Sequence, residues 1–122
     1  MAFPHVLVVD GCQHIWDSLD ELFARAGVHV TYAHDGDVAR RVLDQGDVDL
    51  ALIGVRNGRR GDLLVAEHAD SMGTRVMLVA EPWRSDIEAV RECWPVLDVP
   101  LDAKDVLLRV LAELGIAPGR PV

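Results

Sequence analysis

The chain has 122 residues, half of them apolar, which suits one compact domain with a single core and leaves little room for another. Its formal charge of -8 opposes binding to nucleic acids and to anionic membranes. The longest apolar runs are strand-length, well below the roughly 18–20 residues of a membrane span, and the first residues lack a secretory signal pattern. We therefore expect one cytoplasmic domain over residues 1–122, with a core over 5–115 and a C-terminal tail over 116–122.

The first half of the chain alternates between strand and helix patterns. The apolar run at 5–9 predicts a strand, and apolar residues at helical spacing predict a helix after it. Gly27 stands where a helix C-cap glycine is expected, and residues 28–32 alternate as in a second strand. A short second helix ends near Gly46. The apolar helical positions are Ile15, Trp16, Leu19, Leu22, Phe23 and Ala26, then Val38, Ala39, Val42 and Leu43.

The second half repeats the same unit. Residues 50–55 are uniformly apolar, which is typical of a strand at the centre of a sheet that is covered on both faces. A turn cluster at 57–61 precedes a third helix that ends by Gly73, and strands follow at 76–80 and 96–99. The apolar helical positions are Leu63, Leu64, Ala66 and Ala69, then Ile87, Val90 and Cys93, then Val106, Leu107, Val110, Leu111 and Leu114 before Gly115.

Five strands alternating with five helices predict a doubly wound α/β fold. Apolar strands of this kind form a parallel sheet, and right-handed crossovers place helices on both of its faces. The functional crevice of such a sheet lies at the carboxyl ends of its strands. The residues expected there are 10–12, 54–58, 79–82 and 99–102.

Short stretches in register with these units add to this prediction. They read Val-Leu-Val-Val-Asp at 6–10, Val-Thr-Tyr-Ala-His-Asp-Gly at 30–36 before Ala39, Asp-Leu-Ala-Leu-Ile at 49–53, Gly61, residues 75–80, and Val-Pro-Leu at 99–101. Together they resemble the receiver domain of response regulators over residues 6–114. The resemblance implies a flavodoxin-like, CheY-like (βα)5 three-layer sandwich with a five-stranded parallel sheet. It also implies a role in two-component, or phosphorelay, signal transduction.

The resemblance further implies where phosphorylation chemistry would lie. Receiver domains use an acidic pair that holds magnesium, a phosphoacceptor aspartate, a hydroxyl residue and a lysine. These map to Asp10 and Gly11, to Gly54, to Val79 and to Val99. Only Asp10 keeps the family's chemistry, so the site lacks a nucleophile, a full set of magnesium ligands and a cation for phosphoryl charge. We expect a degenerate pseudo-receiver without catalytic activity, metal or cofactor.

The resemblance also locates the switch that couples the hydroxyl residue to an aromatic on the fifth strand. Counting back from Val99 places that aromatic at Val96, and the short spacing after Val79 leaves Trp94 as the alternative. Asp49 is no substitute for the missing phosphoacceptor, because it stands at the beginning of its strand, at the opposite end of the sheet.

Other residues near the crevice each have two possible roles, one structural and one functional. Cys12 is either a passive thiol or, at a helix start, a reactive one. His14 is either a surface histidine or, with Asp10 and Cys12, part of a metal set, and we predict no metal. The arginines Arg56, Arg59 and Arg60 either belong to a solvated loop or contact an anionic group on a partner.

These observations favour a domain that works by phosphorylation-independent protein binding. The binding surface is either the first helix or the face made by the fourth and fifth helices and the fifth strand. The partner is a histidine kinase, a phosphotransfer protein, another receiver or a second copy of the chain. The alternatives are a phosphocarrier or enzyme-like domain that uses Cys12 or Asp10, and the receiver module of a longer regulator.

Overall fold

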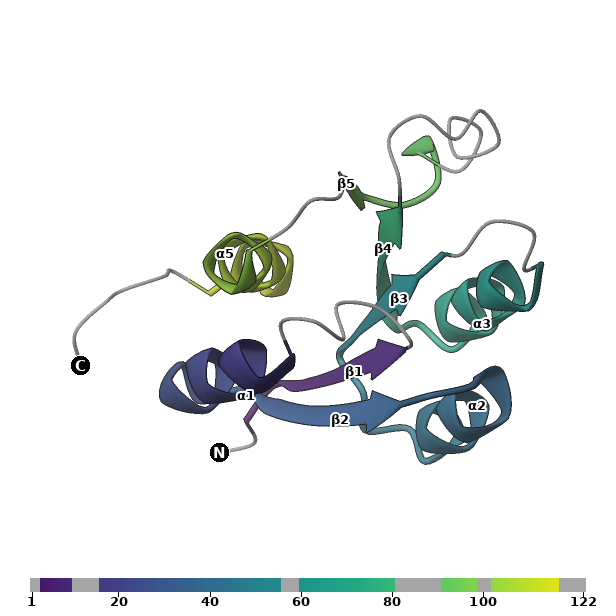
Figure 1. Cartoon of the computed structure of the whole chain (residues 1–122). Coiled ribbons are helices and arrows are strands. Elements are labelled where there is room, and N and C mark those ends of the chain that lie inside the picture. Colours follow the sequence, from purple (N-terminus) through teal and green to yellow (C-terminus); the bar gives the residue numbers. More distant parts are fainter. Residues whose placement is uncertain (1–2, 10–15, 56–59, 81–90, 99–101, 117–122) are drawn as a thin grey trace.

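Five parallel strands form one sheet, with helices on both of its faces (Figure 1). The computed structural model describes residues 3–9, 16–55, 60–80, 91–98 and 102–116. The strands are β1 (His5–Val9), β2 (His29–Ala33), β3 (Leu50–Gly54), β4 (Arg75–Ala80) and β5 (Val96–Asp98). The helices are α1 (Trp16–Arg25), α2 (Gly36–Asp44), α3 (Arg60–Ser71) and α5 (Ala103–Leu114).

The strand order is β2-β1-β3-β4-β5, and every neighbouring pair is parallel. β3 occupies the centre of the sheet, and all five of its residues are buried. Its uniform apolar sequence is explained by this position, because a parallel strand covered on both faces has no solvent side for polar residues. The prediction of a central third strand is confirmed.

The core has one layer on each face of the sheet, because successive side chains of a strand point to opposite faces. Val9 and Ile53 lie in the layer beneath α2 and α3. Val8 and Leu52 lie in the other layer, beneath α1 and α5. Figure 1 shows the two helix pairs on opposite sides of the sheet. Burying each large apolar side chain contributes about 1.5–3 kcal/mol, so both layers hold the sandwich together, and the predicted doubly wound fold is confirmed.

Local signals set the ends of the helices. Asp35 and Asp102 are the N-caps of α2 and α5, and each Oδ1 accepts a hydrogen bond from the backbone N–H three residues later, at 2.9 and 2.8 Å. Gly27 and Gly115 follow α1 and α5 with φ angles of 76° and 75°, a left-handed conformation that glycine adopts without strain. Both helices therefore stop where the sequence predicts.

Two side chains predicted on buried helix faces are exposed instead. Val38 in α2 is 39% exposed and Leu64 in α3 is 55% exposed, whereas their neighbours Ala39 and Val65 are buried. Adjacent residues of a helix lie about 100° apart around its axis, and in these two pairs Ala39 and Val65 face the core while Val38 and Leu64 lie at the edge of the buried face.

Arg60 and Gly61 were predicted in a turn and belong to α3. The predicted positions Ile15, Ile87 and Val90, and the tail after residue 116, lie outside the described residues. The extent of the domain therefore stays a prediction. Among the described helices, none combines the length and the apolar character that crossing a bilayer requires.

Candidate functional site

The carboxyl ends of the strands meet at one edge of the sheet, where the sequence places the crevice. β3 ends at Gly54 and β4 at Ala80, and Gly54 is the register partner of Val79. On the other side of β4, Ala80 is the register partner of Asp98, the last residue of β5. Two residues from the predicted site, Gly54 and Val79, are thus direct neighbours.

The surroundings of Gly54 are apolar. Val55 follows it, and its backbone N–H donates a hydrogen bond of 2.9 Å to the carbonyl oxygen of Val79. Gly54 is buried, and the exposed fractions of Val55 and Val79 are only 7% and 6%. Val79 packs in the core layer beneath α1 and α5, at the position where the resemblance predicts the family's hydroxyl residue. No group in this pair of neighbours can accept a phosphoryl group.

Apart from the two candidates for the switch aromatic, the remaining predicted site positions fall where the structure gives no side chain. Arg60 is the first residue of α3, and its side chain is not described. The others lie outside the described residues, so the predictions made for them stand as predictions: Asp10, Gly11, Cys12, His14, Arg56, Arg59 and Val99. Cys93, the other cysteine, is exposed and free.

Both candidates for the switch aromatic lie near the start of β5. Val96 is the register partner of Leu78, and Trp94 stands two residues before it. Both side chains are partly buried against the core layer beneath α2 and α3. Val79 belongs to the opposite layer, so the sheet lies between it and Val96.

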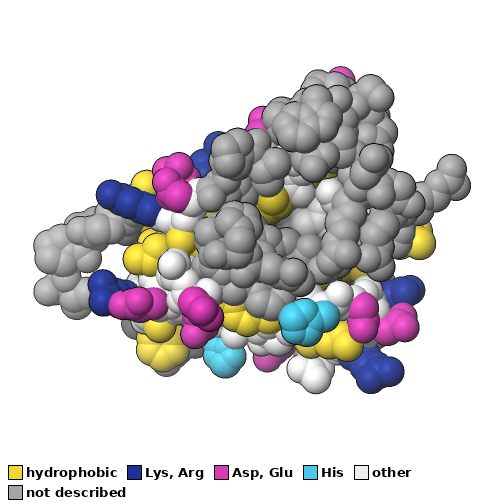
Figure 2. Space-filling model, viewed as in Figure 1, with side chains coloured by type: hydrophobic (Ala, Val, Ile, Leu, Met, Phe, Trp, Pro, Cys, Tyr) yellow, Lys and Arg dark blue, Asp and Glu magenta, His cyan; other side chains and the backbone are white. Residues whose placement is uncertain are grey.

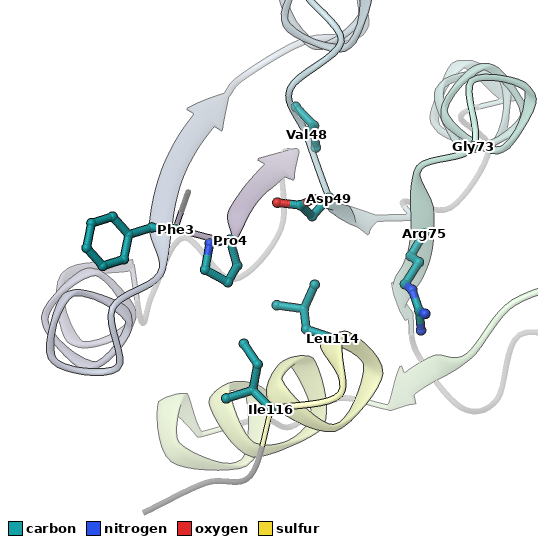
Figure 3. A pocket seen from close by; sticks show the side chains of 8 residues that line it. All are labelled: Phe3, Pro4, Val48, Asp49, Gly73, Arg75, Leu114 and Ile116. Atoms are coloured by element: carbon teal, nitrogen blue, oxygen red, sulfur yellow. The ribbon is translucent and has the colours of Figure 1, made fainter. Parts of the chain in front are cut away.

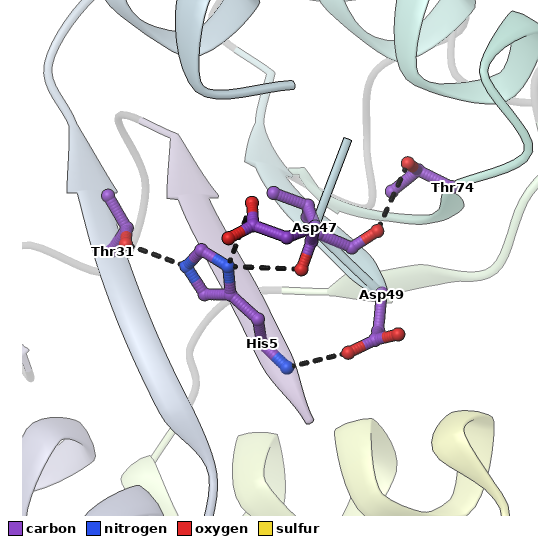
Figure 4. A network of polar contacts seen from close by, with 6 residues as sticks. His5, Thr31, Asp47, Asp49 and Thr74 are labelled. Carbon is purple, nitrogen blue, oxygen red and sulfur yellow. Dashed lines mark hydrogen bonds and ion pairs between the residues drawn. The ribbon is translucent and has the colours of Figure 1, made fainter. Parts of the chain in front are cut away.

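Asp49 lies at the amino-terminal end of the sheet, as predicted. It stands immediately before β3, and its Oδ2 accepts a hydrogen bond of 2.8 Å from the backbone N–H of His5 (Figure 4). The backbone N–H of Asp49 in turn donates to the His5 carbonyl oxygen at 2.8 Å. The carboxylate therefore joins the beginnings of β1 and β3, a full strand length from Gly54.

His5 is the centre of a polar network at that end of the sheet (Figure 4). Its Nε2 lies 2.7 Å from the Thr31 hydroxyl on β2, and its Nδ1 lies 3.2 Å from the Asp47 carbonyl oxygen. The Thr74 hydroxyl donates to the Val48 carbonyl oxygen at 3.3 Å. Sequence reasoning missed this network, although its signal was present: polar residues flank the amino ends of strands that a parallel sheet brings together.

Charged side chains of opposite sign are interspersed over the surface seen in Figure 2. Arg25 Nη2 lies 2.6 Å from Glu21 Oε1 on α1, and Arg40 Nη2 lies 3.3 Å from Asp37 Oδ1 on α2. Among the described residues, these pairs place acidic side chains beside basic ones, which does not favour a nucleic acid. The described residues also contain no group of three or more His, Cys, Asp or Glu side chains arranged to hold a metal ion.

Comparisons with known proteins relate this geometry to one fold. No family model matches the chain. The curated Protein PetR of Rhodobacter capsulatus is 30% identical over 119 residues, covering 94% of this chain and 50% of PetR. The chain thus spans about half the length of the curated relative it matches.

Solved structures are similar over nearly the whole chain. A response regulator receiver protein from Burkholderia phymatum has a TM-score of 0.77 at 19% identity, covering 96% of this chain and 99% of that one. A CheY-like receiver domain protein from Methanospirillum hungatei has a TM-score of 0.71 at 17% identity, covering 93% and 95%. The chain has the CheY-like, flavodoxin-like fold of response-regulator receiver domains.

Proposed function

We propose that this chain is an atypical receiver of two-component signalling that binds a protein partner without being phosphorylated. The observation that carries the proposal is Gly54, a buried residue without a side chain at the carboxyl end of β3, beside the apolar Val79. A phosphoacceptor needs a nucleophilic oxygen, and magnesium needs more than one carboxylate as a rule. A receiver fold without these groups keeps the outer surfaces of its helices and sheet. These surfaces can still bind another protein.

The partner surface that we favour is the exposed side of α5. Its inward residues Val106 and Val110 are fully buried, whereas Leu108 is 37% exposed between the exposed Lys104 and Ala112. An exposed leucine on a helix with charged neighbours suits an interface in which an apolar anchor is surrounded by polar contacts. The partner is a histidine kinase, a phosphotransfer protein, another receiver or a second copy of this chain, and this role implies a cytoplasmic location.

The match to half of PetR supports a related proposal, that the domain is the receiver module of a longer regulator. In that case the partner surface and a further domain would belong to one polypeptide. The absence of phosphorylation at Gly54 is expected in both arrangements, so the same chemical test applies to both.

The chemical test is incubation with acetyl phosphate and magnesium, followed by intact mass measurement. We expect no phosphoryl adduct, while a phosphorylatable receiver treated in parallel is labelled. An adduct would contradict the proposal, and peptide mapping would then locate it. Labelling of Cys12 or Asp10 would instead support the phosphocarrier or enzyme-like alternative.

The binding test compares two matched leucines on opposite faces of the sheet. Leu108→Glu changes α5 and Leu64→Glu changes α3, where Leu64 is 55% exposed. Each variant is immobilised and used to recover partners from the native cell. We expect Leu108→Glu to lose the partner that the wild type retains and Leu64→Glu to keep it. Equal recovery by both variants would exclude α5 as the partner surface.

A further inference from the structure

A hollow of about 430 Å³ lies at the amino-terminal end of the sheet, opposite Gly54. Its lining comes from the residues before β1 and β3, from the start of β4 and from the end of α5 (Figure 3). Pockets that hold small molecules have volumes of about 300–1,000 Å³ and combine apolar walls with a few polar groups. The hollow has both features.

Two side chains of opposite charge, Asp49 and Arg75, line the hollow. They are backbone neighbours, since the Arg75 N–H donates to the Asp49 carbonyl oxygen at 3.2 Å, but their side chains form no ion pair with each other. Asp49 uses Oδ2 to accept from the His5 N–H, and Arg75 uses Nη1 to donate to the Glu113 carbonyl oxygen. A carboxylate has a second oxygen and a guanidinium has further N–H groups, so each can also contact a ligand.

The apolar walls are held in place by the fold. Pro4 and Leu114 lie on opposite sides of the hollow, and Ile116 lies beside Leu114 (Figure 3). The left-handed turn at Gly115 positions Ile116, whose N–H donates to the Leu111 carbonyl oxygen at 2.9 Å. Phe3 lies at the rim of the hollow, with its ring directed away from Pro4 and Leu114 (Figure 3), so the apolar wall consists of Pro4, Leu114 and Ile116. A preformed wall of this kind lowers the entropic cost of binding.

The two charges restrict the class of ligand. A molecule with only a carboxylate would be attracted by Arg75 and repelled by Asp49. A molecule with only an ammonium group would be attracted by Asp49 and repelled by Arg75. We propose that the hollow binds an α-amino-carboxylate zwitterion with an apolar side chain, as a free amino acid or as a short apolar peptide. The carboxylate contacts Arg75, the ammonium group contacts Asp49, and the side chain packs against Pro4, Leu114 and Ile116.

The test uses ligands that differ by one charge, titrated into the full chain and followed by amide NMR. The ligands are leucine, leucyl-leucine, N-acetyl-leucine and leucine amide. We expect leucine or leucyl-leucine to shift the amides of Asp49, Arg75, Leu114 and Ile116. We also expect the zwitterion to bind about two- to fivefold more tightly than either singly charged analogue, as exposed charge pairs allow. Comparison of the titrations with leucine and with leucyl-leucine shows whether the hollow binds the free amino acid or the peptide.

Two variants test the role of each charge. Arg75→Gln should abolish the preference for the zwitterion over leucine amide and keep the preference over N-acetyl-leucine. Asp49→Asn should abolish the preference for the zwitterion over N-acetyl-leucine and keep the preference over leucine amide. Arg25→Gln, which removes an exposed arginine of α1, should behave as the wild type. The affinities of the four ligands are compared with one another within each folded variant. The comparison in the wild type tests the proposal even if a variant does not fold. The proposal is overturned if these amides do not shift, or if all ligands bind the wild type equally.

Discussion

Gly54 lies directly beside Val79 in the parallel pairing of β3 and β4, and the next N–H, from Val55, donates to the Val79 carbonyl oxygen at 2.9 Å. The resemblance to receiver domains predicts the phosphoacceptor at Gly54 and the hydroxyl residue at Val79. One of these neighbouring positions therefore has no side chain, and the other has an apolar one. A single substitution at either position replaces one missing group without supplying its partners.

Gly54→Asp should not restore phosphorylation. The new carboxylate would lack the second acidic residue at Gly11, the hydroxyl at Val79 and the lysine at Val99, which together hold magnesium and stabilise phosphoryl charge. Intact mass measurement after incubation with acetyl phosphate and magnesium should show no adduct. Robust magnesium-dependent labelling of this variant would contradict our account of the lost site.

The same substitution should also destabilise the fold. Asp at this buried position would place a carboxylate beside the apolar Val55 and Val79, without the lysine that receivers use, at a cost of about 1–3 kcal/mol. Gly54→Ala is the matched control, because it adds a Cβ without a charge. Urea denaturation of both variants should find Gly54→Asp the less stable by that amount, and equal stabilities would show that the carboxylate reaches solvent.

Val79→Thr should lower stability without creating a switch. Val79 is 6% exposed in a core layer, and a hydroxyl there exchanges packing for a polar group that needs a partner. We expect a loss of about 1–3 kcal/mol in the free energy of unfolding. Val38→Thr, at a position 39% exposed on α2, is the control and should change stability by less than about 0.5 kcal/mol. Equal losses at both positions would be inconsistent with a packed Val79.

Beryllium fluoride with magnesium, which mimics the phosphoryl group in receivers, should leave the domain unchanged. Val79 and Val96 pack on opposite faces of the sheet and neither can form the hydrogen bond of a switch, so no second conformation is favoured by the mimic. Amide spectra recorded with and without it should agree over β5 and the predicted fourth helix, whose positions Ile87 and Val90 lie outside the described part. Widespread shifts there would mean that the domain still switches.

The N-cap of α5 should contribute measurably to stability. Asp102 Oδ1 accepts from the Asp105 N–H at 2.8 Å, so Asp102→Ala should cost about 1 kcal/mol. Asp102→Asn retains a capping oxygen and should cost only a few tenths of a kcal/mol. Thermal or urea unfolding of the two variants checks the difference. If Ala and Asn are equivalent, the cap does not hold the helix that carries Leu108.

Much of this protein was predictable from local sequence, for local physical reasons. The apolar run at 50–55 needs burial on both faces, which implies a central parallel strand. Gly27 and Gly115 stand where helices end, because glycine adopts the left-handed conformation without strain. The loss of the nucleophile at Gly54 rests on residue identity and on the resemblance to receiver domains, so it stays a prediction.

The tertiary structure decided what depends on segments that are distant along the chain. It placed Gly54 beside Val79, set Val96 on the opposite face, and turned Leu64 towards solvent while Val65 became buried. The amino-terminal hollow was not predicted, because Asp49 and Arg75 meet the end of α5 only after the sheet and the helices have packed. Periodicity along one segment determines that segment's apolar face, whereas the neighbours of that face are determined by long-range packing.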